Sequence, residues 1–421
     1  MENKRKQQMK LQRKRQRRYI RFFFFFGLLL GSVAVFSFYH FYYEPQLAKT
    51  TEKKLTKYEQ QIAILTEQNT DLQKKIDLNT QQLQEEEKKK PRMVFGQTNK
   101  GDQFPDLTKQ IERKISDTGF IGSVLVIKNN QIVLEKGYGY ADKSEERLND
   151  PTTEFMIASV QKAYTAVLIM TLIENGLLTM DTPLSNFYPN IPNSNQITIK
   201  SLLNMTSGLQ IKGFNSQSGS EEDTINYALN NATYSPLTKW NYSPVNYTLL
   251  AGIIRQLSGQ SYQDYFTSQI ITKLNLQQTG FYQNFYANPK HAVSSDSKSD
   301  PYLNPIKTAD STFASETGTG NAYSSTGDMF TFIQALLDGK LITKNSLTEL
   351  WTRPKLAFDY TYAAGFYHNE QSINGHGVLV GFEPTLAFSP DGSTGIITFS
   401  NYIYPKSANA NLTKEIFKLL A

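Results

Sequence analysis

The first 90 residues divide into three segments of contrasting polarity. Residues 1–21 are strongly basic, residues 22–43 contain no Asp, Glu, Lys or Arg, and residues 46–90 are polar with regularly spaced apolar positions. The uncharged segment would extend about 33 Å as a helix, which is enough to cross a bilayer. Its length, its basic flank and the lack of a small-residue cleavage motif favour an uncleaved signal anchor over a cleaved signal peptide or a buried core helix.

Residues 46–90 repeat apolar positions at alternating spacings of three and four, the heptad pattern of a coiled coil. Because the seam is short and includes asparagines, two interpretations stay open: a parallel dimeric coiled coil, which would make a homodimer, or a single solvated helix that acts as a spacer. In either interpretation residues 46–90 form a stalk. Residues 91–105 are expected to form a linker after it. The seam positions are Leu55, Tyr58, Ile62, Leu65, Asn69, Leu72, Ile76, Asn79 and Leu83.

Residues 106–421 show a strand pattern at both ends. Segments 123–128 and 131–136 flank Asn129-Asn130, and segments 385–389 and 395–399 flank a Pro-Asp-Gly-Ser turn, so each pair predicts a hairpin. An amphipathic helix precedes the first hairpin, with Asp106 as its expected cap, and another follows the second. Between them the pattern is helical or irregular. We therefore predict an α+β domain, in which an antiparallel sheet built from both ends carries flanking helices and a helical lobe.

The net charge of +6 is unevenly distributed. Residues 1–21 carry +9, which leaves −3 for the rest of the chain. The positive charge therefore indicates a cytoplasmic N-terminus, with everything after residue 43 outside the cell, and not a nucleic-acid partner. The chain has no cysteine and only four scattered histidines, which excludes a thiol nucleophile and a cysteine-ligated metal and disfavours an HExxH-type site.

Two Ser-x-x-Lys sequences are candidates for nucleophilic chemistry, at residues 159–162 and 295–298, whereas Gly-x-Ser-x-Gly does not occur. Ser159 follows an apolar run and precedes a strongly amphipathic helix that ends before Gly176, so its hydroxyl can face a cleft. Lys162 lies one turn later on the same side, and burial would favour a neutral amine that takes the serine's proton. The alternative is an N-cap serine beside a solvated lysine. Ser295 lies in a polar run that predicts a surface loop.

Residues 155–162 resemble the active-site stretch of the β-lactamase-related serine hydrolases, a group that includes class C β-lactamases, low-molecular-weight penicillin-binding proteins, D-aminopeptidases and D-alanyl esterases. The resemblance covers most of residues 106–421. Segments 137–142, 197–209 and 323–329 are similar to the family's G-x-G-x-A, ITIxxLLxHTSGL and YSTxxDM segments, with Met205 in place of the usual histidine. The resemblance implies that Ser159 is the nucleophile and that neither a metal nor an organic cofactor is needed.

Tyr242-Ser243-Pro244 is similar to the family's Tyr-x-Asn motif, which implies that Tyr242 is the base partner or proton shuttle. Pro244 stands where the family has an asparagine that hydrogen-bonds the substrate amide and the lysine. Proline has no side-chain donor or acceptor, so this departure favours an ester substrate over a peptide or a β-lactam. Asn246, on the next turn, is a candidate replacement in substrate binding.

Residues 375–382 resemble the family's Lys-Thr-Gly or His-x-Gly strand, although the segment is one residue shorter than usual. His376 is present and Val378 replaces a glycine. The resemblance implies that His376, Gly377 and Val378 line the substrate site, and that the oxyanion hole combines the Ser159 amide with an amide of this strand.

These inferences predict a single-pass membrane protein with an extracellular serine hydrolase domain over residues 106–421. The resemblance implies an acyl-serine reaction on D-alanyl groups, carried either by teichoic acid as esters or by the D-Ala-D-Ala stem peptide of peptidoglycan. A tethered site suits such a cell-envelope polymer better than a diffusing drug. The alternatives are a catalytically impaired sensor or scaffold with a penicillin-binding fold, and a β-lactamase.

Overall fold

The chain forms two separate units, Met1–Arg92 and Met93–Ala421. The basic tail of residues 1–21, the predicted anchor of residues 22–43 and the predicted linker up to residue 103 lie outside the described residues. Within the part of the chain that is described, no helix is both long and apolar enough to cross a membrane. The computed structural model describes residues 60–71, 74–75, 104–213, 215, 219–306, 308–403, 405 and 408–420.

The described residues of the first unit are helical, which agrees with the helix expected there. The hydroxyls of Thr66 and Thr70 each donate to the carbonyl four residues earlier. Ile62 and Leu65, two of the predicted seam positions, have exposed fractions of 53% and 58%. Whether this helix pairs with a second copy stays a prediction.

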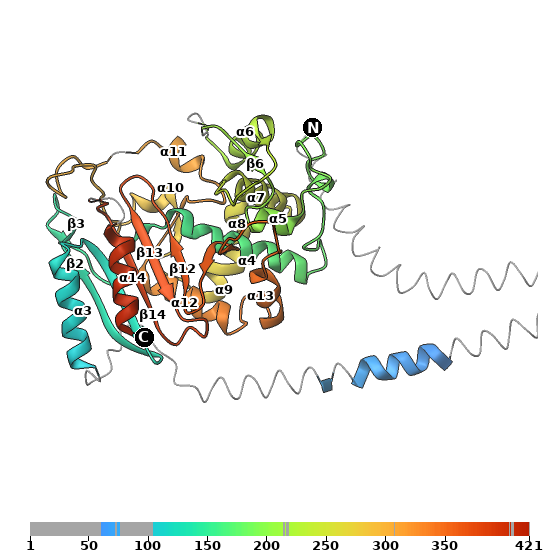
Figure 1. Ribbon diagram of the computed structural model, residues 1–421, viewed down its shortest axis with the longest axis horizontal. Coiled ribbons are helices and arrows are strands. Elements are labelled where there is room, and N and C mark those ends of the chain that lie inside the picture. The colour runs from blue at the N-terminus through green and yellow to red at the C-terminus, as the bar shows by residue number, and fades with distance from the viewer. Residues whose placement is uncertain are drawn as a thin grey trace, which may run out of the picture. The chain divides into compact units, whose positions relative to one another are not determined.

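A seven-stranded antiparallel sheet supports the second unit (Figure 1). Its order places the first hairpin beside the last, which confirms the predicted sheet built from both ends of the domain. Asn129 and Asn130 have φ of 53° and 60°, the left-handed conformation that a two-residue hairpin turn requires. In order across the sheet, the strands are β10 (Tyr362–Ala363), β11 (Phe366–His368), β12 (Ile373–His376), β13 (Glu383–Phe388), β14 (Gly395–Ser400), β1 (Gly122–Lys128) and β2 (Gln131–Tyr138).

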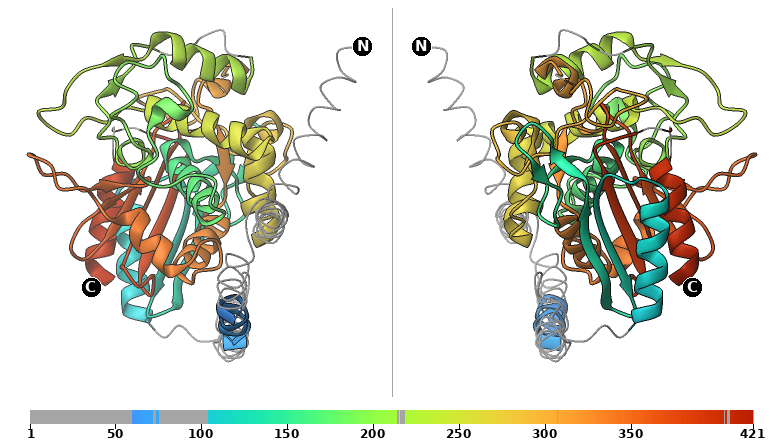
Figure 2. Two further views of the ribbon diagram at one scale, coloured as in Figure 1. Left: turned by 90° about the vertical axis from the view of Figure 1, so that its right-hand side faces the viewer. Right: turned by 90° about the vertical axis from the view of Figure 1, so that its left-hand side faces the viewer.

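Helices cover both faces of this sheet, and the alternation of side chains along β1 decides which residues face which layer. Val124 and Val126 pack with α3 (Pro105–Asp117) and α14 (Ala408–Leu420), which lie side by side on one face (Figure 2). Leu125 and Ile127 belong to the larger core on the other face. Asp106 lies in the first turn of α3, which begins at Pro105 after an N-cap at Phe104, so the expected cap was wrong by two residues.

The helical lobe surrounds α4 (Gln161–Glu174). Residues 161–170 are buried on every side of this helix, so the expected amphipathic pattern was wrong: the lobe covers the face that was expected to meet solvent. The remaining helical elements are η1 (Ala158–Val160), η2 (Leu184–Asn186), α5 (Ile199–Leu203), α6 (Glu221–Asn231), α7 (Val245–Ser258), α8 (Tyr262–Phe266), η3 (Thr267–Ile271), α9 (Thr272–Leu274), α10 (Tyr282–Phe285), α11 (Asp310–Ala314), α12 (Thr326–Leu337) and α13 (Lys344–Trp351). The short outer strands are β3 (Tyr140–Asp142), β4 (Arg147–Leu148), β5 (Phe155–Met156), β6 (Leu209–Gln210), β7 (Thr233–Tyr234), β8 (Gly280–Phe281) and β9 (Ala322–Ser324).

Glu154 is a buried carboxyl group directly before β5. Its side chain is 1% exposed, and Oε1 accepts a hydrogen bond of 2.8 Å from Asn288 Nδ2. Oε2 has no hydrogen-bond partner within the described structure. Burial raises the pKa of Glu154 to about 7; the Asp328 carboxylate raises it further, while Lys290 and the Asn288 hydrogen bond oppose the shift.

We expect Glu154 to make the folded domain less stable as the pH rises. The pKa of about 7 in the folded state lies above the ordinary 4.5, so the stabilisation is fully present below pH 4.5 and is lost as the pH rises through 7. Glu154→Gln should remove this dependence, which should amount to about 2 kcal/mol once solvent screening is allowed for. Thermal unfolding of both proteins between pH 4.5 and 8 measures it, and parallel pH curves would contradict the prediction.

Candidate active site

Ser159 lies in the η1 turn, between the apolar strand β5 and helix α4. Its neighbours Ala158 and Val160 are buried, whereas Ser159 itself is partly exposed. Ala158 has a φ of 46°, a left-handed conformation that is uncommon for a residue with a side chain. Such strain persists only where the surrounding structure imposes it, and here it lies directly before the predicted nucleophile.

The structure brings the three predicted catalytic residues together. Lys162 Nζ donates to Ser159 Oγ over 3.1 Å, and Tyr242 OH donates to the same oxygen over 2.9 Å. Lys162 Nζ also lies 5.3 Å from the centroid of the Tyr242 ring. The serine oxygen therefore has two neighbouring groups that can exchange protons with it, one on each side.

Lys162 is held from behind by a backbone carbonyl. Its side chain is 1% exposed, and Nζ donates to Thr319 O over 2.9 Å. Thr319 could not be predicted from the sequence, because every residue has a backbone carbonyl. Ordering a long lysine side chain costs conformational entropy. The hydrogen bond to Thr319 O offsets part of that cost and holds the amine within reach of Ser159.

Residues of α4 also fix the segment that supplies this carbonyl. Gln161 Nε2 donates to Asn321 Oδ1 over 2.9 Å, and Gln161 Oε1 accepts from the amide of Ala322 over 2.7 Å. Thr165 Oγ1 donates to Gly318 O over 2.8 Å. The first turn of α4 and residues 318–322 thus share a buried polar network, which holds this segment beside Lys162.

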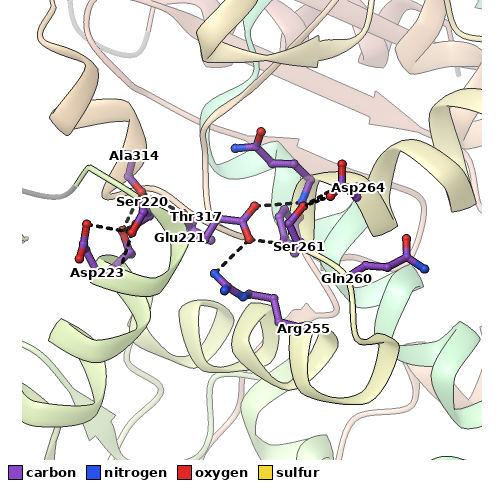
Figure 3. A network of polar contacts seen from close by, with 12 residues as sticks. Ser220, Glu221, Asp223, Arg255, Gln260, Ser261, Asp264, Ala314 and Thr317 are labelled. Atoms are coloured by element: carbon purple, nitrogen blue, oxygen red, sulfur yellow. Dashed lines mark hydrogen bonds and ion pairs between the residues drawn. The ribbon is translucent and has the colours of Figure 1, made fainter. Parts of the chain in front are cut away.

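A second network anchors the other side of this segment. Tyr262 OH lies 2.7 Å from Thr165 Oγ1, and the amide of Tyr262 donates to Glu221 over 2.8 Å. Glu221 also accepts from Arg255 and from the amide of Gln263, so that its carboxylate joins α6, α7 and α8 (Figure 3). This carboxylate caps α8 and therefore positions Tyr262 against α4. Glu221 and Thr317 also line a cavity of about 270 Å³, whose lining does not include Ser159.

Tyr242 is embedded in aromatic side chains. Its ring lies edge-on to Trp240 and to Tyr362, each with a centroid distance of 6.1 Å. Trp240 is fixed by a hydrogen bond of 3.1 Å from Nε1 to Asn204 O. Burial raises the pKa of Tyr362 well above its ordinary value and that of Tyr367, in the same cluster, to about 12, so both remain neutral phenols near pH 7.

The side chains around Tyr242-Ser243-Pro244, the motif that differs from the family's Tyr-x-Asn, stabilise the loop before α7. Asn246 is 1% exposed; its Oδ1 accepts from Ser207 Oγ over 2.5 Å, and its Nδ2 donates to Ser243 O over 2.8 Å. Met205, which replaces the usual histidine, accepts from the amide of Ser243 at Sδ over 3.4 Å. These contacts of Asn246 stabilise the Tyr242 loop. Its suggested role in substrate binding, in place of the asparagine missing at Pro244, stays a prediction.

Gly377 is the residue of the third motif that touches the nucleophile turn. A Cβ atom at this position would lie 2.7 Å from the amide nitrogen of Ser159 and 3.0 Å from Ile157 O, so only glycine fits. Val378 is 42% exposed, and its side chain therefore does not occupy this close contact. The valine that replaces the family's glycine at position 378 therefore does not prevent the close contact between Gly377 and the Ser159 amide.

His376 contacts a buried carboxylate that the sequence analysis missed. Its Nε2 lies 3.1 Å from Glu383 Oε1, and the side chains of His376 and Glu383 are 38% and 0% exposed. Successive residues of a strand point to opposite faces, so His376 lies on the other side of β12 from the contact surface of Gly377. Glu383 had no signal in the sequence, because an acidic residue after a turn is common on solvated surfaces.

The second Ser-x-x-Lys sequence lacks the arrangement found at the first. Ser295 is 2% exposed, which contradicts the expected surface position, and its Oγ donates to Leu303 O. Lys298 is exposed. Over the described ranges, no group of three or more His, Asp or Glu side chains is close enough to hold a metal ion.

Sequence comparison places these motifs in a known family. A family model described as Beta-lactamase matches residues 108–420. The chain is 33% identical over 316 residues to the putative penicillin-binding protein PbpX of Bacillus subtilis, which covers 75% of this chain and 79% of that protein. It is 28% identical over 302 residues to Protein flp of Staphylococcus aureus, covering 66% of this chain and 59% of flp.

Solved structures share the fold at lower identity. FmtA from Staphylococcus aureus superimposes with a TM-score of 0.68 at 23% identity, over 82% of this chain and 95% of that one. A D-amino acid amidase from Ochrobactrum anthropi superimposes with a TM-score of 0.63 at 20% identity, over 75% and 97%.

We expect Gly377→Ala to slow the reaction of Ser159 about 100-fold, because the new methyl group would displace the strand from the serine amide. The measurement is the rate constant for labelling by a fluorophosphonate. Gly375→Ala is the matched control, since the three atoms nearest a Cβ at Gly375 all belong to the side chain of Leu386, at 3.0 to 3.3 Å, and none to the backbone. Equal labelling rates for the two variants would contradict the prediction.

Tyr242→Phe should reduce the labelling rate by about 10² to 10⁴-fold, because it removes the hydroxyl that lies 2.9 Å from Ser159 Oγ. Tyr367→Phe removes a phenol from the same aromatic cluster and should keep a rate close to that of the unaltered protein. A similar loss in both variants would indicate damage to the cluster and not loss of a proton carrier.

Proposed function

Because the chain belongs to the beta-lactamase family, we propose that it is a serine hydrolase that removes D-alanyl groups from a cell-envelope polymer. One observation carries the proposal: Lys162 Nζ and Tyr242 OH both lie within hydrogen-bonding distance of the partly exposed Ser159 Oγ. A sensor or scaffold that had lost its activity would have no need to keep this arrangement.

The reaction proceeds in two halves. Ser159 Oγ attacks the acyl carbon while its proton passes to whichever of Lys162 and Tyr242 is unprotonated. The oxyanion is stabilised by the amides of Ser159 and Val378, since the Gly377 amide already donates to Pro384 O. The same proton then goes to the leaving oxygen or nitrogen as the acyl bond breaks. In the second half water attacks the acyl-serine, which frees the acyl group as its carboxylic acid and restores the serine hydroxyl. That acid is D-alanine when the substrate is the ester, whereas a D-Ala-D-Ala peptide loses D-alanine as the amine leaving group in the first half.

Ester-linked D-alanine of teichoic acid is the preferred substrate. Pro244 cannot supply the side-chain amide that would orient a peptide bond, and the side chain of Asn246 is already hydrogen-bonded to Ser207 and Ser243. An alkoxide leaving group needs less assistance than an amine, so an ester tolerates this loss better. The names of PbpX, a putative penicillin-binding protein, and of the D-amino acid amidase support a D-amino acyl substrate for this chain.

The proposed location follows from the N-terminal pattern. An uncleaved anchor at residues 22–43, with the basic tail in the cytoplasm, would place the hydrolase domain outside the cell, on a stalk above the membrane. Such a tether confines the site to envelope polymers, which is why we favour this substrate over a freely diffusing β-lactam.

The deciding experiment measures D-alanine release by the full-length protein in detergent. We expect release from purified lipoteichoic acid and much less from a pentapeptide that ends in D-Ala-D-Ala, with Ser159→Ala inactive on both. Release from the pentapeptide alone would replace the esterase by a carboxypeptidase, and hydrolysis of a chromogenic cephalosporin would favour a β-lactamase. No release and no labelling by fluorescent penicillin or fluorophosphonate would reject the enzyme in favour of the scaffold.

A further inference from the structure

Glu383 is a fully buried carboxylate that the proposed reaction does not use. One oxygen lies 3.1 Å from His376 Nε2, and the other, Oε2, has no hydrogen-bond partner within the described structure. Removing a carboxyl group from water without pairing both oxygens is energetically costly. A buried group of this kind destabilises the fold by itself, which points to a role in the function of the neighbouring segment.

The pair lies at the base of a turn. His376 ends β12 and Glu383 begins β13, so their contact joins the two ends of residues 377–382. The first residue of that turn, Gly377, donates its amide to Pro384 O over 3.0 Å and packs against the Ser159 amide. The His376–Glu383 contact is therefore one residue from the surface that meets the nucleophile.

The tip of the same turn is strained. Leu379 and Phe382 exchange backbone hydrogen bonds of 3.1 and 2.9 Å around Val380 and Gly381, whose φ angles are 42° and 83°. Positive φ is strongly disfavoured for a β-branched residue such as Val380. Ser294 Oγ donates to Val380 O over 2.6 Å and so fixes the tip. Strained backbone persists only where surrounding contacts hold it in place. We therefore expect contacts at the base of this turn as well as at its tip.

We propose that Glu383 is a positioning residue that acts through His376. By holding the His376 ring it fixes the base of the 377–382 turn, keeps Gly377 against Ser159 and sets the strand amides for the oxyanion; the inference rests on the acyl-serine reaction proposed above. His376 then contributes to catalysis through its carboxylate partner and not by binding the substrate. The position of His376 across β12 from the Gly377 contact supports this assignment.

The test compares Glu383→Ala, His376→Ala, the double variant and the conservative Glu383→Gln, whose Oε1 can still accept from the imidazole. Each is assayed with p-nitrophenyl acetate and by fluorophosphonate labelling, with thermal unfolding as a control for folding. We expect Glu383→Ala and His376→Ala to lower kcat about 10- to 100-fold with little change in KM, the double variant to lose no more than either, and Glu383→Gln to recover most of the rate. Additive losses, or a rise in KM for His376→Ala alone, would overturn the proposal.

Hydrogen exchange of the turn provides a readout that does not depend on activity. Amides of residues 377–382 should exchange faster in Glu383→Ala and in His376→Ala than in the unaltered protein, and Glu383→Gln should restore protection. Unchanged exchange would overturn the inference even if the enzyme is active. Faster exchange in a protein that neither labels nor hydrolyses esters would support the positioning contact and reject the hydrolase function instead.

Discussion

The contact between Gly377 and the amide of Ser159 joins the two halves of the domain. The sheet brings β12 to this point, and the helical lobe brings the η1 turn, so the site exists only where the two layers meet. A side chain at Gly377 would separate them. The left-handed Ala158 and Val380 on either side indicate that the approach is enforced against local backbone preference, and the buried core supplies the energy that sustains it.

The two groups that contact Ser159 Oγ are held in different ways. Lys162, in the first turn of α4, is buried and hydrogen-bonded to the Thr319 carbonyl, whereas Tyr242 is held by aromatic packing and contacts the serine through a single hydrogen bond. Lys162 is buried on one side of the proton-transfer path and aromatic rings pack around Tyr242 on the other, while Ser159 itself stays partly exposed. Hydrogen bonds in such a setting are stronger than in water, and misplaced partners are correspondingly costly.

Local patterns predicted a large part of this architecture. The two terminal hairpins follow from strand segments that flank turn residues. The position of Ser159 before a buried helix follows from the apolar runs on either side of it and from its spacing to Lys162. The role of Tyr242 could be predicted only from the resemblance to a family, because Tyr242 lies 83 residues from Ser159 and tyrosine is common in this chain. The amphipathic interpretation of α4 was wrong, because helical periodicity cannot show that a second layer covers the outer face.

By itself the sequence determined the α+β class, the candidate nucleophile and its lysine, because these depend on residues that are neighbours along the chain. Only the tertiary structure decided that Gly377 is the glycine against Ser159, that Thr319 supplies a carbonyl to Lys162, and that His376 meets Glu383. Each of these contacts joins segments from different layers, and packing brings together backbone groups and common side chains that carry no signature of their own. The difference lies in the range of the interactions. Spacing between neighbouring residues can be read from the sequence, whereas contacts between distant segments form only when the layers pack around a common core.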